Sequence, residues 1–537
     1  MFIKDCSKQY AHKYSPCLLL TESYRDEKGI PRHRIIMNLS KLPKPLEEVI
    51  INQVKGKKMV SLEDICQEDN RSLGEVLILK KLSDRVGLTK ILQKHLGNLV
   101  SNLVLATALN RISLPKAKYS LRNWLETTYL PEILKTPLSE FHYNKLYQAL
   151  EVLAEKQDAI EDDLWEITKQ QEEGLTLMLY DITSTYLEGW ENQLAAFGYN
   201  RDGKKGKKQL VIGLITTKEG RPVSVEVFRG NTTDKTTLIK KIKDTQKRFH
   251  IKEVIYVFDR GMKDEPKLAT LRSQDIRYIT ALTRKEIKKL LENNSQIQLG
   301  LFDKQNLAEY EIDNRRYIIC KSDQERRNRR TREILLEKTE EKMRMIKRNV
   351  SNGRWKNPAV IAARTERWLR RWKMKRYFEI KVKEGYFTYQ KKENVIETAE
   401  DLDGVYILET NTPKQLLTAS EVQKGYKNLS KVEQSFRVIK NVLEIRPVHH
   451  RKKTTTQGHI FVCFLALYLR RELEIQLAPL LQESTFDYLL TQLREIRQSV
   501  LVAGEHKTMV VNKLNGIQRN LVSNLRMRIT PVPLRPI

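Results

Sequence analysis

The chain has 537 residues and a formal net charge of +30, from 97 Lys and Arg against 67 Asp and Glu. That length suggests about two to four domains, and 40% hydrophobic with 31% charged residues is typical of a globular protein. The longest strongly apolar run, 460–469, has about half the length that a bilayer requires, so we expect no membrane span. The excess of positive charge favours a polyanionic partner, because it attracts phosphate backbones at long range.

Two N-terminal domains of different structure are predicted. Strand-like runs at 17–24 and 33–40 flank a Gly-Ile-Pro turn, which indicates a small β-rich module over 1–60. Over 61–172, apolar residues recur at three- and four-residue spacing, as in amphipathic helices. This helical domain could have a packing role only, or it could bind DNA and mediate dimerisation.

From residue 173 the apolar pattern predicts three strands, a helix, a strand, a helix and a strand. Asp234 is the expected N-cap of the first of these helices. This order resembles that of the ribonuclease H-like nucleotidyltransferase fold, whereas periodicity alone indicates only an α/β protein. We therefore expect a mixed-sheet catalytic core in two parts, 173–285 and 419–480, followed by a C-terminal region at 481–537.

Residues 286–418 interrupt this core and are predicted to form a mainly β insertion domain with a basic helical stretch. Residues 321–380 contain 20 Lys and Arg against 8 Asp and Glu, and three Trp residues lie among them. A solvated helix face is the simpler interpretation of the charge, but aromatic and basic residues together suit contact with DNA backbone and bases. The residues proposed for phosphate contact are Arg326, Arg327, Arg329 and Arg330.

Two carboxylates follow buried strand-like runs directly. Asp181 ends the run LTLMLY, and Asp259 ends the run VIYVF. Ligands of open α/β sheets bind beyond the carboxyl ends of the strands, so both acids are expected at the site. Two such carboxylates would repel each other unless a cation lies between them, and Mg²⁺ is bound by carboxylates together with water and phosphate. Each acid taken alone could instead be a strand-end cap or an ion-pair partner.

A later segment, 426–440, places four functional residue types at offsets of 0, 7, 11 and 14. These residues are Tyr426, Glu433, Arg437 and Lys440. On a single helix they would share one face. Glu433 could then bind a metal while Arg437 and Lys440 hold DNA phosphates, and an exposed Glu–Arg pair is the simpler alternative.

With these residues in place, the sequence resembles the insertion-sequence DDE transposases of the IS-four group, which carry a YREK signature. Tyr426, Leu429, Glu433 and Lys440 keep every spacing of that signature, but Leu429 stands where the family has Arg. The resemblance spans roughly 175–475 and includes YDITSTYLEG, VFRGNTTDKTTL, YVFDRGM and GHIFVCFLALYL.

The resemblance implies a transposase in which Asp181, Asp259 and Glu433 bind two Mg²⁺ or Mn²⁺ ions. Such an enzyme nicks the transposon ends and then uses the freed 3′-hydroxyl for strand transfer. The implied partner is double-stranded DNA, at the terminal inverted repeats and at the target, bound by a homodimer on paired ends. The implied location is the bacterial cytoplasm, in association with the nucleoid. Tyr426 is expected to stack on a displaced base, and Leu429→Arg is expected to be tolerated.

Two other classes of function remain open. A catalytically silent DNA-binding protein derived from a transposase would have lost at least one of the three carboxylates, and all three are present. A ribonuclease H-like nuclease of another kind would not account for the Tyr-to-Lys spacing or for the long interruption before Glu433.

Overall fold

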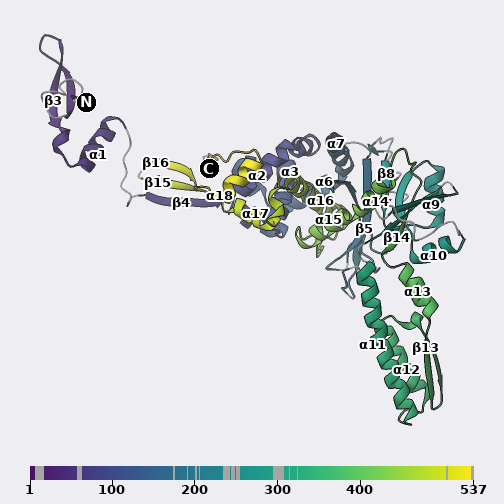
Figure 1. Ribbon diagram of the computed structural model, residues 1–537. Coiled ribbons are helices and arrows are strands. Elements are labelled where there is room, and N and C mark those ends of the chain that lie inside the picture. Colours follow the sequence, from purple (N-terminus) through teal and green to yellow (C-terminus); the bar gives the residue numbers. More distant parts are fainter. Residues whose placement is uncertain are drawn as a thin grey trace. The chain divides into compact units, whose positions relative to one another are not determined.

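The computed structural model describes most of the chain, and its elements are shown in Figure 1. The described residues are 1–6, 17–56, 63, 65–172, 176–189, 191–199, 202–204, 206–233, 242, 248–249, 254–293, 307–313, 315–322, 325–503 and 506–533. The predicted N-cap Asp234 lies outside them. The chain divides into two compact units, 1–75 with 127–133 and 487–537, and 76–126 with 134–486.

The smaller unit contains two antiparallel three-stranded sheets. The first has the order β1-β2-β3 and the second β16-β15-β4. Their bounds, with the helices of this unit, are β1 (Phe2–Asp5), β2 (Leu18–Arg25), β3 (Pro31–Asn38), α1 (Lys44–Val54), β4 (Ile65–Ser72), α5 (Leu130–Leu134), α17 (Phe486–Arg494), β15 (Arg497–Ala503), β16 (His506–Val511) and α18 (Gly516–Asn524). Strand β4 therefore pairs with a strand from the far end of the chain, a long-range contact for which local sequence patterns contain no signal.

The central helix α16 (Lys453–Gln476) of the larger unit is mostly buried, and it packs against α3 (Leu88–Ser113) and α6 (Tyr143–Glu155). The unit also contains α2 (Gly74–Arg85), α4 (Leu121–Leu125) and α7 (Gln157–Lys169). At Gly458 the backbones of α16 and α6 approach so closely that an added Cβ would lie 2.0 Å from the Leu150 carbonyl oxygen. The amphipathic spacing correctly predicts the helices between residues 74 and 169, but the predicted helical domain over 61–172 also contains strand β4. No helix in the described part of the chain is long and apolar enough to cross a bilayer.

The larger unit also contains one mixed eight-stranded sheet with the order β10-β11-β14-β9-β8-β5-β6-β7. The strands are β5 (Thr176–Tyr186), β6 (Gln209–Thr217), β7 (Pro222–Arg229), β8 (Val254–Phe258), β9 (Arg277–Ala281), β10 (Leu307–Ile312), β11 (Arg315–Lys321) and β14 (Val405–Thr410). Strands β5, β8 and β9 are parallel, and every other neighbouring pair is antiparallel. The protein is therefore a mixed α/β protein with one large mixed sheet.

The region between β9 and β14 corrects the prediction of a mainly β insertion. Strands β10, β11 and β14 do not form a separate domain, because they pair in succession beyond β9 and extend the main sheet. Between β11 and β14 the chain is mainly helical. Its elements are α11 (Glu325–Ser351), α12 (Pro358–Arg371), β12 (Phe378–Lys383), β13 (Tyr386–Lys391) and α13 (Glu393–Asp401). We call residues 325–401 the helical subdomain, which has a hydrophobic core of its own.

Candidate active site

Asp181 and Asp259 are brought side by side by the register of two parallel strands. Strand β5 pairs with β8 so that Tyr180 lies opposite Phe258, and the next residue in each segment is the acid. Asp259 directly follows the end of β8, as predicted, whereas Asp181 lies within β5, which continues to Tyr186, so the prediction that Asp181 ends its strand is wrong. Neighbouring strands are separated by about 4.8 Å, which brings the two carboxylates within reach of one shared cation. Asp259 is exposed and Asp181 is partly exposed.

Both acids point to the same face of the sheet. The residues with the opposite parity, such as Tyr180, Ile182 and Phe258, fill a core on the other face together with side chains of α7 and α9 (Glu265–Ser273). Because side chains alternate along a strand, Asp181 and Asp259 lie on the face away from that core. Helix α14 (Ala419–Lys427) covers this second face, since an added Cβ on Gly425 would lie 3.4 Å from both Leu177 and Ile279.

Asp259 is held by two hydrogen bonds. The backbone N–H of Gly261 donates to Oδ2 at 3.2 Å, and the Tyr426 hydroxyl donates to Oδ1 at 3.4 Å. Burial raises the pKa of Tyr426, and the negative charges of Asp259 and Glu433 raise it further. The hydroxyl therefore stays protonated and available as a donor to Asp259, and Glu433 is close enough to act on the same group.

Glu433 lies on α15 (Leu429–Asn441), which packs against β5. The prediction of a single helix over 426–440 is wrong, because α14 ends at Lys427 and α15 begins at Leu429. Asn428 lies at the junction, and its side chain makes no capping hydrogen bond to α15. Tyr426 therefore belongs to the first helix, while Glu433, Arg437 and Lys440 belong to the second.

The exposed side chains of Glu433 and Arg437 lie one helical turn apart. Within the described residues, no ion pair joins them and Arg437 has no other acidic partner. The simpler interpretation, an exposed Glu–Arg pair, is therefore not what the structure contains. Both side chains are available to ligands from solvent.

Lys440 differs from Arg437 because it is already paired. Its Nζ lies 2.8 Å from Oδ1 of Asp202, and an Arg446 guanidinium nitrogen lies 2.6 Å from the same oxygen. The Asp202 side chain is 3% exposed and that of Lys440 is 12% exposed. Neither Asp202 nor Arg446 was predicted from the sequence to belong to the site. The one local pattern that could have pointed to Arg446 is its position six residues after Lys440.

Leu429 is buried at the start of α15, with 8% of its surface exposed. The expectation that an Arg at this position would reach DNA and be tolerated is therefore wrong. The reason is physical: the first turn of α15 packs its apolar side chains inward, and a guanidinium there would lose its hydration.

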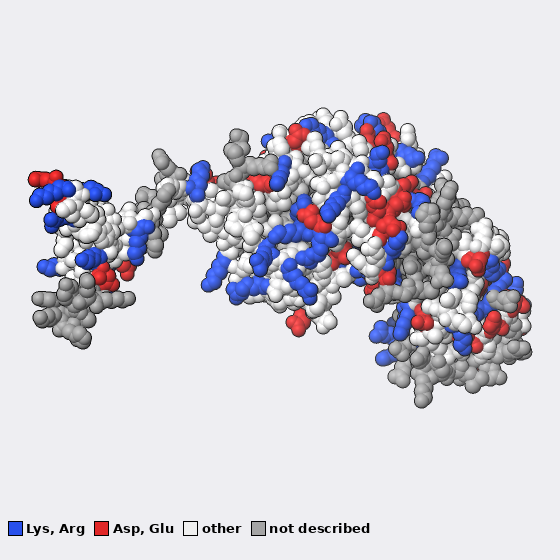
Figure 2. Space-filling view, turned by 90° about the horizontal axis from the view of Figure 1, so that it is seen from above, with Lys and Arg blue, Asp and Glu red and all other residues white. Residues whose placement is uncertain are grey.

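The predicted basic contacts lie at the start of α11. Of the four arginines, the side chain of Arg326 is outside the described part of the chain. Arg327 and Arg330 are exposed and have no ion-pair partner among the described residues. Arg329 is exposed too, but it pairs with Glu333 at 3.3 Å and with Glu400 at 3.6 Å. On the face shown in Figure 2, Lys and Arg outnumber Asp and Glu among the charged side chains of the central surface.

The three tryptophans of the helical subdomain are half-buried and pack against its core. The rings of Trp368 and Trp372 lie 5.2 Å apart, and the guanidinium of Arg364 lies 4.0 Å from the ring of Trp355. Part of each aromatic surface is thus already in contact with protein. The interleaved Trp and Arg pattern therefore arises at least partly from packing within the subdomain.

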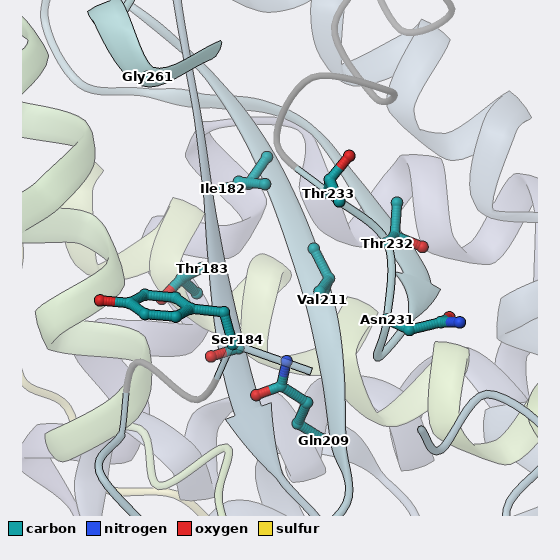
Figure 3. A pocket seen from close by; sticks show the side chains of 10 residues that line it. Ile182, Thr183, Ser184, Gln209, Val211, Asn231, Thr232, Thr233 and Gly261 are labelled. Atoms are coloured by element: carbon teal, nitrogen blue, oxygen red, sulfur yellow. The ribbon is translucent and has the colours of Figure 1, made fainter. Parts of the chain in front are cut away.

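A cavity of about 440 Å³ lies beside the acids and is shown in Figure 3. It is lined by Ile182, Thr183, Ser184, Tyr199, Gln209, Val211, Asn231, Thr232, Thr233 and Gly261. Strands β5 and β6 form one wall of it, and the segment after β7 forms another. None of the three carboxylates lines this cavity, so we place the candidate site around Asp181 and Asp259 and not in the cavity.

The carboxylate oxygens of Asp181, Asp259 and Glu433 are suitable ligands for a hard divalent cation. Two carboxylates on neighbouring strands, with a third on the adjacent helix, offer only oxygen ligands, as Mg²⁺ and Mn²⁺ require. The side chains are not gathered into a complete site, because no three His, Cys, Asp or Glu groups among the described residues lie within reach of one ion. Glu433 is on the surface, where its side chain has room to change rotamer.

Comparison with known proteins identifies the larger unit. Residues 172–469 match the family model described as the transposase DDE domain. No curated protein sequence matches the chain. Among solved structures, a piggyBac transposase synaptic complex with hairpin DNA is similar at 7% identity and a TM-score of 0.36, over 73% of this chain and 70% of that one.

Proposed function

The chain belongs to the transposase DDE domain family, and we propose that it is a DNA transposase that cuts and joins DNA through Asp181, Asp259 and Glu433. The observation that carries the proposal is the β5–β8 register, which sets two carboxylates side by side on the face that α14 and α15 cover. In finer detail, the proposal is an IS-four-type enzyme that moves an insertion sequence by cut and paste, acting as a homodimer on paired ends.

Each residue of the site has a distinct role in this proposal. Asp181 and Asp259 supply negative oxygens from backbone that the sheet holds rigid, and Glu433 supplies a third from a neighbouring helix. The Tyr426 hydroxyl orients the Asp259 carboxylate through its hydrogen bond. Two divalent cations, when bound, would activate the attacking oxygen and stabilise the leaving oxygen at the cleaved phosphodiester.

The DNA would be held by cations around these acids. Arg437 is exposed one turn beyond Glu433 and suits a phosphate contact. Arg327 and Arg330 add exposed charge from the helical subdomain. The net charge of +30 supports long-range attraction of the polyanion.

The proposal is tested by nicking of a plasmid that carries the ends of the element flanking the gene. Asp181→Asn, Asp259→Asn and Glu433→Gln each remove a ligand charge with little change of shape, so each should lower the nicking rate by about 10³-fold or more in Mg²⁺. Binding of the ends should persist. A matched control is Asp275→Asn, because Asp275 is exposed, is distant from the site in the fold and has a positive φ that Asn also tolerates.

Two outcomes would contradict the proposal. Parental nicking by any one of the three variants would remove that residue from the site. Tight binding of the ends by the parental protein, without nicking in either Mg²⁺ or Mn²⁺, would instead indicate a catalytically silent DNA-binding protein.

A further inference from the structure

Asp202 is a buried carboxylate that two cations share. Oδ1 of Asp202 lies 2.8 Å from Lys440 Nζ and 2.6 Å from an Arg446 nitrogen. A second nitrogen of Arg446 donates to Oδ1 of Asn441 at 2.6 Å, which fixes the orientation of the guanidinium. Two positively charged groups thus converge on one acceptor, and they belong to the end of α15 and the segment that follows it.

The chemistry of this arrangement suits an anion with one negative charge. A carboxylate and a DNA phosphodiester both carry a single charge spread over two oxygens, and both accept charge-assisted hydrogen bonds from Lys and Arg. The pair could therefore bind a phosphodiester in place of Asp202 without any change in formal charge.

The position of this pair relative to Glu433 is also informative. Lys440 follows Glu433 by seven residues on the same helix, which corresponds to about 10 Å along one face. A phosphate held by Lys440 and Arg446 would then lie within a few nucleotides of a bond cut beside Glu433. That distance is appropriate for a contact that sets the position of the cleaved strand.

We propose that Lys440 and Arg446 form a phosphodiester subsite that Asp202 occupies in the absence of DNA, so that Asp202 and the DNA backbone compete for the same two cations. This inference rests on the proposed function, since it assigns a DNA contact to that site. Asp202 is then a positioning residue that keeps the subsite assembled and lowers its affinity for DNA. Arg446 becomes a DNA contact that the family signature does not contain.

The test is a binding titration of the full chain with a fluorescent blunt duplex of random sequence, in EDTA to prevent cutting. Asp202→Asn should raise the affinity about tenfold, because the DNA no longer has to displace a charged competitor. The gain should disappear in the Asp202→Asn/Lys440→Gln double variant, since the two residues act through one contact. Arg446→Gln alone should weaken binding and reduce the slope of log affinity against log salt by about 0.9.

The matched control is Glu188→Gln. Glu188 pairs with Lys207 at 2.5 Å, so this variant removes one negative charge from an ion pair without altering Lys440. The affinity of Glu188→Gln for the duplex should rise by much less than the affinity of Asp202→Asn. Equal effects of Glu188→Gln and Asp202→Asn would mean that net charge alone is responsible and would overturn the inference.

Other outcomes are equally decisive. Weaker binding by Asp202→Asn would overturn the inference, because removing a competitor cannot lower the affinity for DNA. If Asp202→Asn does not fold, Arg446→Gln still tests the subsite, because it keeps the Lys440–Asp202 pair. An unchanged salt slope for Arg446→Gln would then overturn the inference. Failure of the parental chain to bind any duplex would overturn the proposed function as well, whereas normal nicking with a failed Asp202 test would leave that function intact.

Discussion

The paired strands β5 and β8, which position Asp181 and Asp259, differ from the helical subdomain in what determines the position of a functional side chain. At the strand ends, the register of two buried strands fixes both acids, and a one-residue shift would turn them to the other face. In the helical subdomain most of the described arginines, such as Arg329 and Arg370, are on exposed helix surface, where some are paired and others are not. The backbone thus determines the positions of the two aspartates, whereas local ion pairs determine those of the arginines.

This difference has a consequence for what substitutions should do. On strands β5 and β8 and on the helices that cover them, a single substitution should have a large effect, because the packed backbone offers the side chains no alternative position. On the exposed face of the helical subdomain, single changes should have small and graded effects, because phosphate contacts contribute separately to binding. Substitutions in the two regions should therefore differ in the size of their effects.

Leu429→Arg is expected to be the most disruptive change near the acids. Leu429 is 8% exposed, and placing an unpaired guanidinium there should lower the free energy of unfolding by about 2–4 kcal/mol. Thermal unfolding of the full chain measures this. Ser430→Arg adds the same charge at the next position, which is exposed, and should melt close to the parental temperature. A parental melting temperature for Leu429→Arg would mean that this part of α15 is not packed as described.

Trp368→Ala should destabilise the helical subdomain without altering its DNA contacts. The ring packs against the subdomain core and against Trp372, so its loss should cost about 1–3 kcal/mol locally. Hydrogen exchange over 325–401 should become faster, while the salt dependence of DNA binding stays parental. Weaker binding with unchanged exchange would contradict this and would show that the ring contacts DNA bases.

Arg327→Gln and Arg330→Gln should each have a small effect that is limited to binding. If each side chain contacts one phosphate, each change should reduce the salt slope of DNA binding by about 0.9. Arg329→Gln is the matched control from the same helix, because Arg329 is already paired with Glu333 and Glu400, and its effect on the slope should be smaller. Unchanged salt slopes for all three variants would mean that this face of α11 is a solvated surface with no role in DNA binding.

The sequence predicted the part of the site that local patterns determine. The apolar runs before Asp181 and Asp259 predicted two strands, and both are present; β8 ends just before Asp259 as expected, but β5 continues past Asp181 to Tyr186. The seven-residue spacing from Glu433 to Lys440 placed them on one helix, as found. These predictions succeeded because strand and helix periodicities are properties of neighbouring residues.

The features that the sequence did not predict depend on long-range contacts. The pairing of β14 with β9, which makes β10, β11 and β14 part of the main sheet, joins segments far apart in the chain. The pairing of Lys440 with Asp202 has the same origin, as does the burial of Leu429. Charge and periodicity cannot distinguish an exposed lysine from one that a distant carboxylate already holds.

The most direct test of the central claim is the position of a bound metal. A crystal of the full chain with DNA, soaked in Mn²⁺, would reveal the ion by its anomalous scattering. Our account predicts a peak between the carboxylates of Asp181 and Asp259, with Glu433 turned toward it, and no such peak in Asp259→Asn. A peak elsewhere in the molecule, with the two strand-end carboxylates binding no ion, would contradict the account.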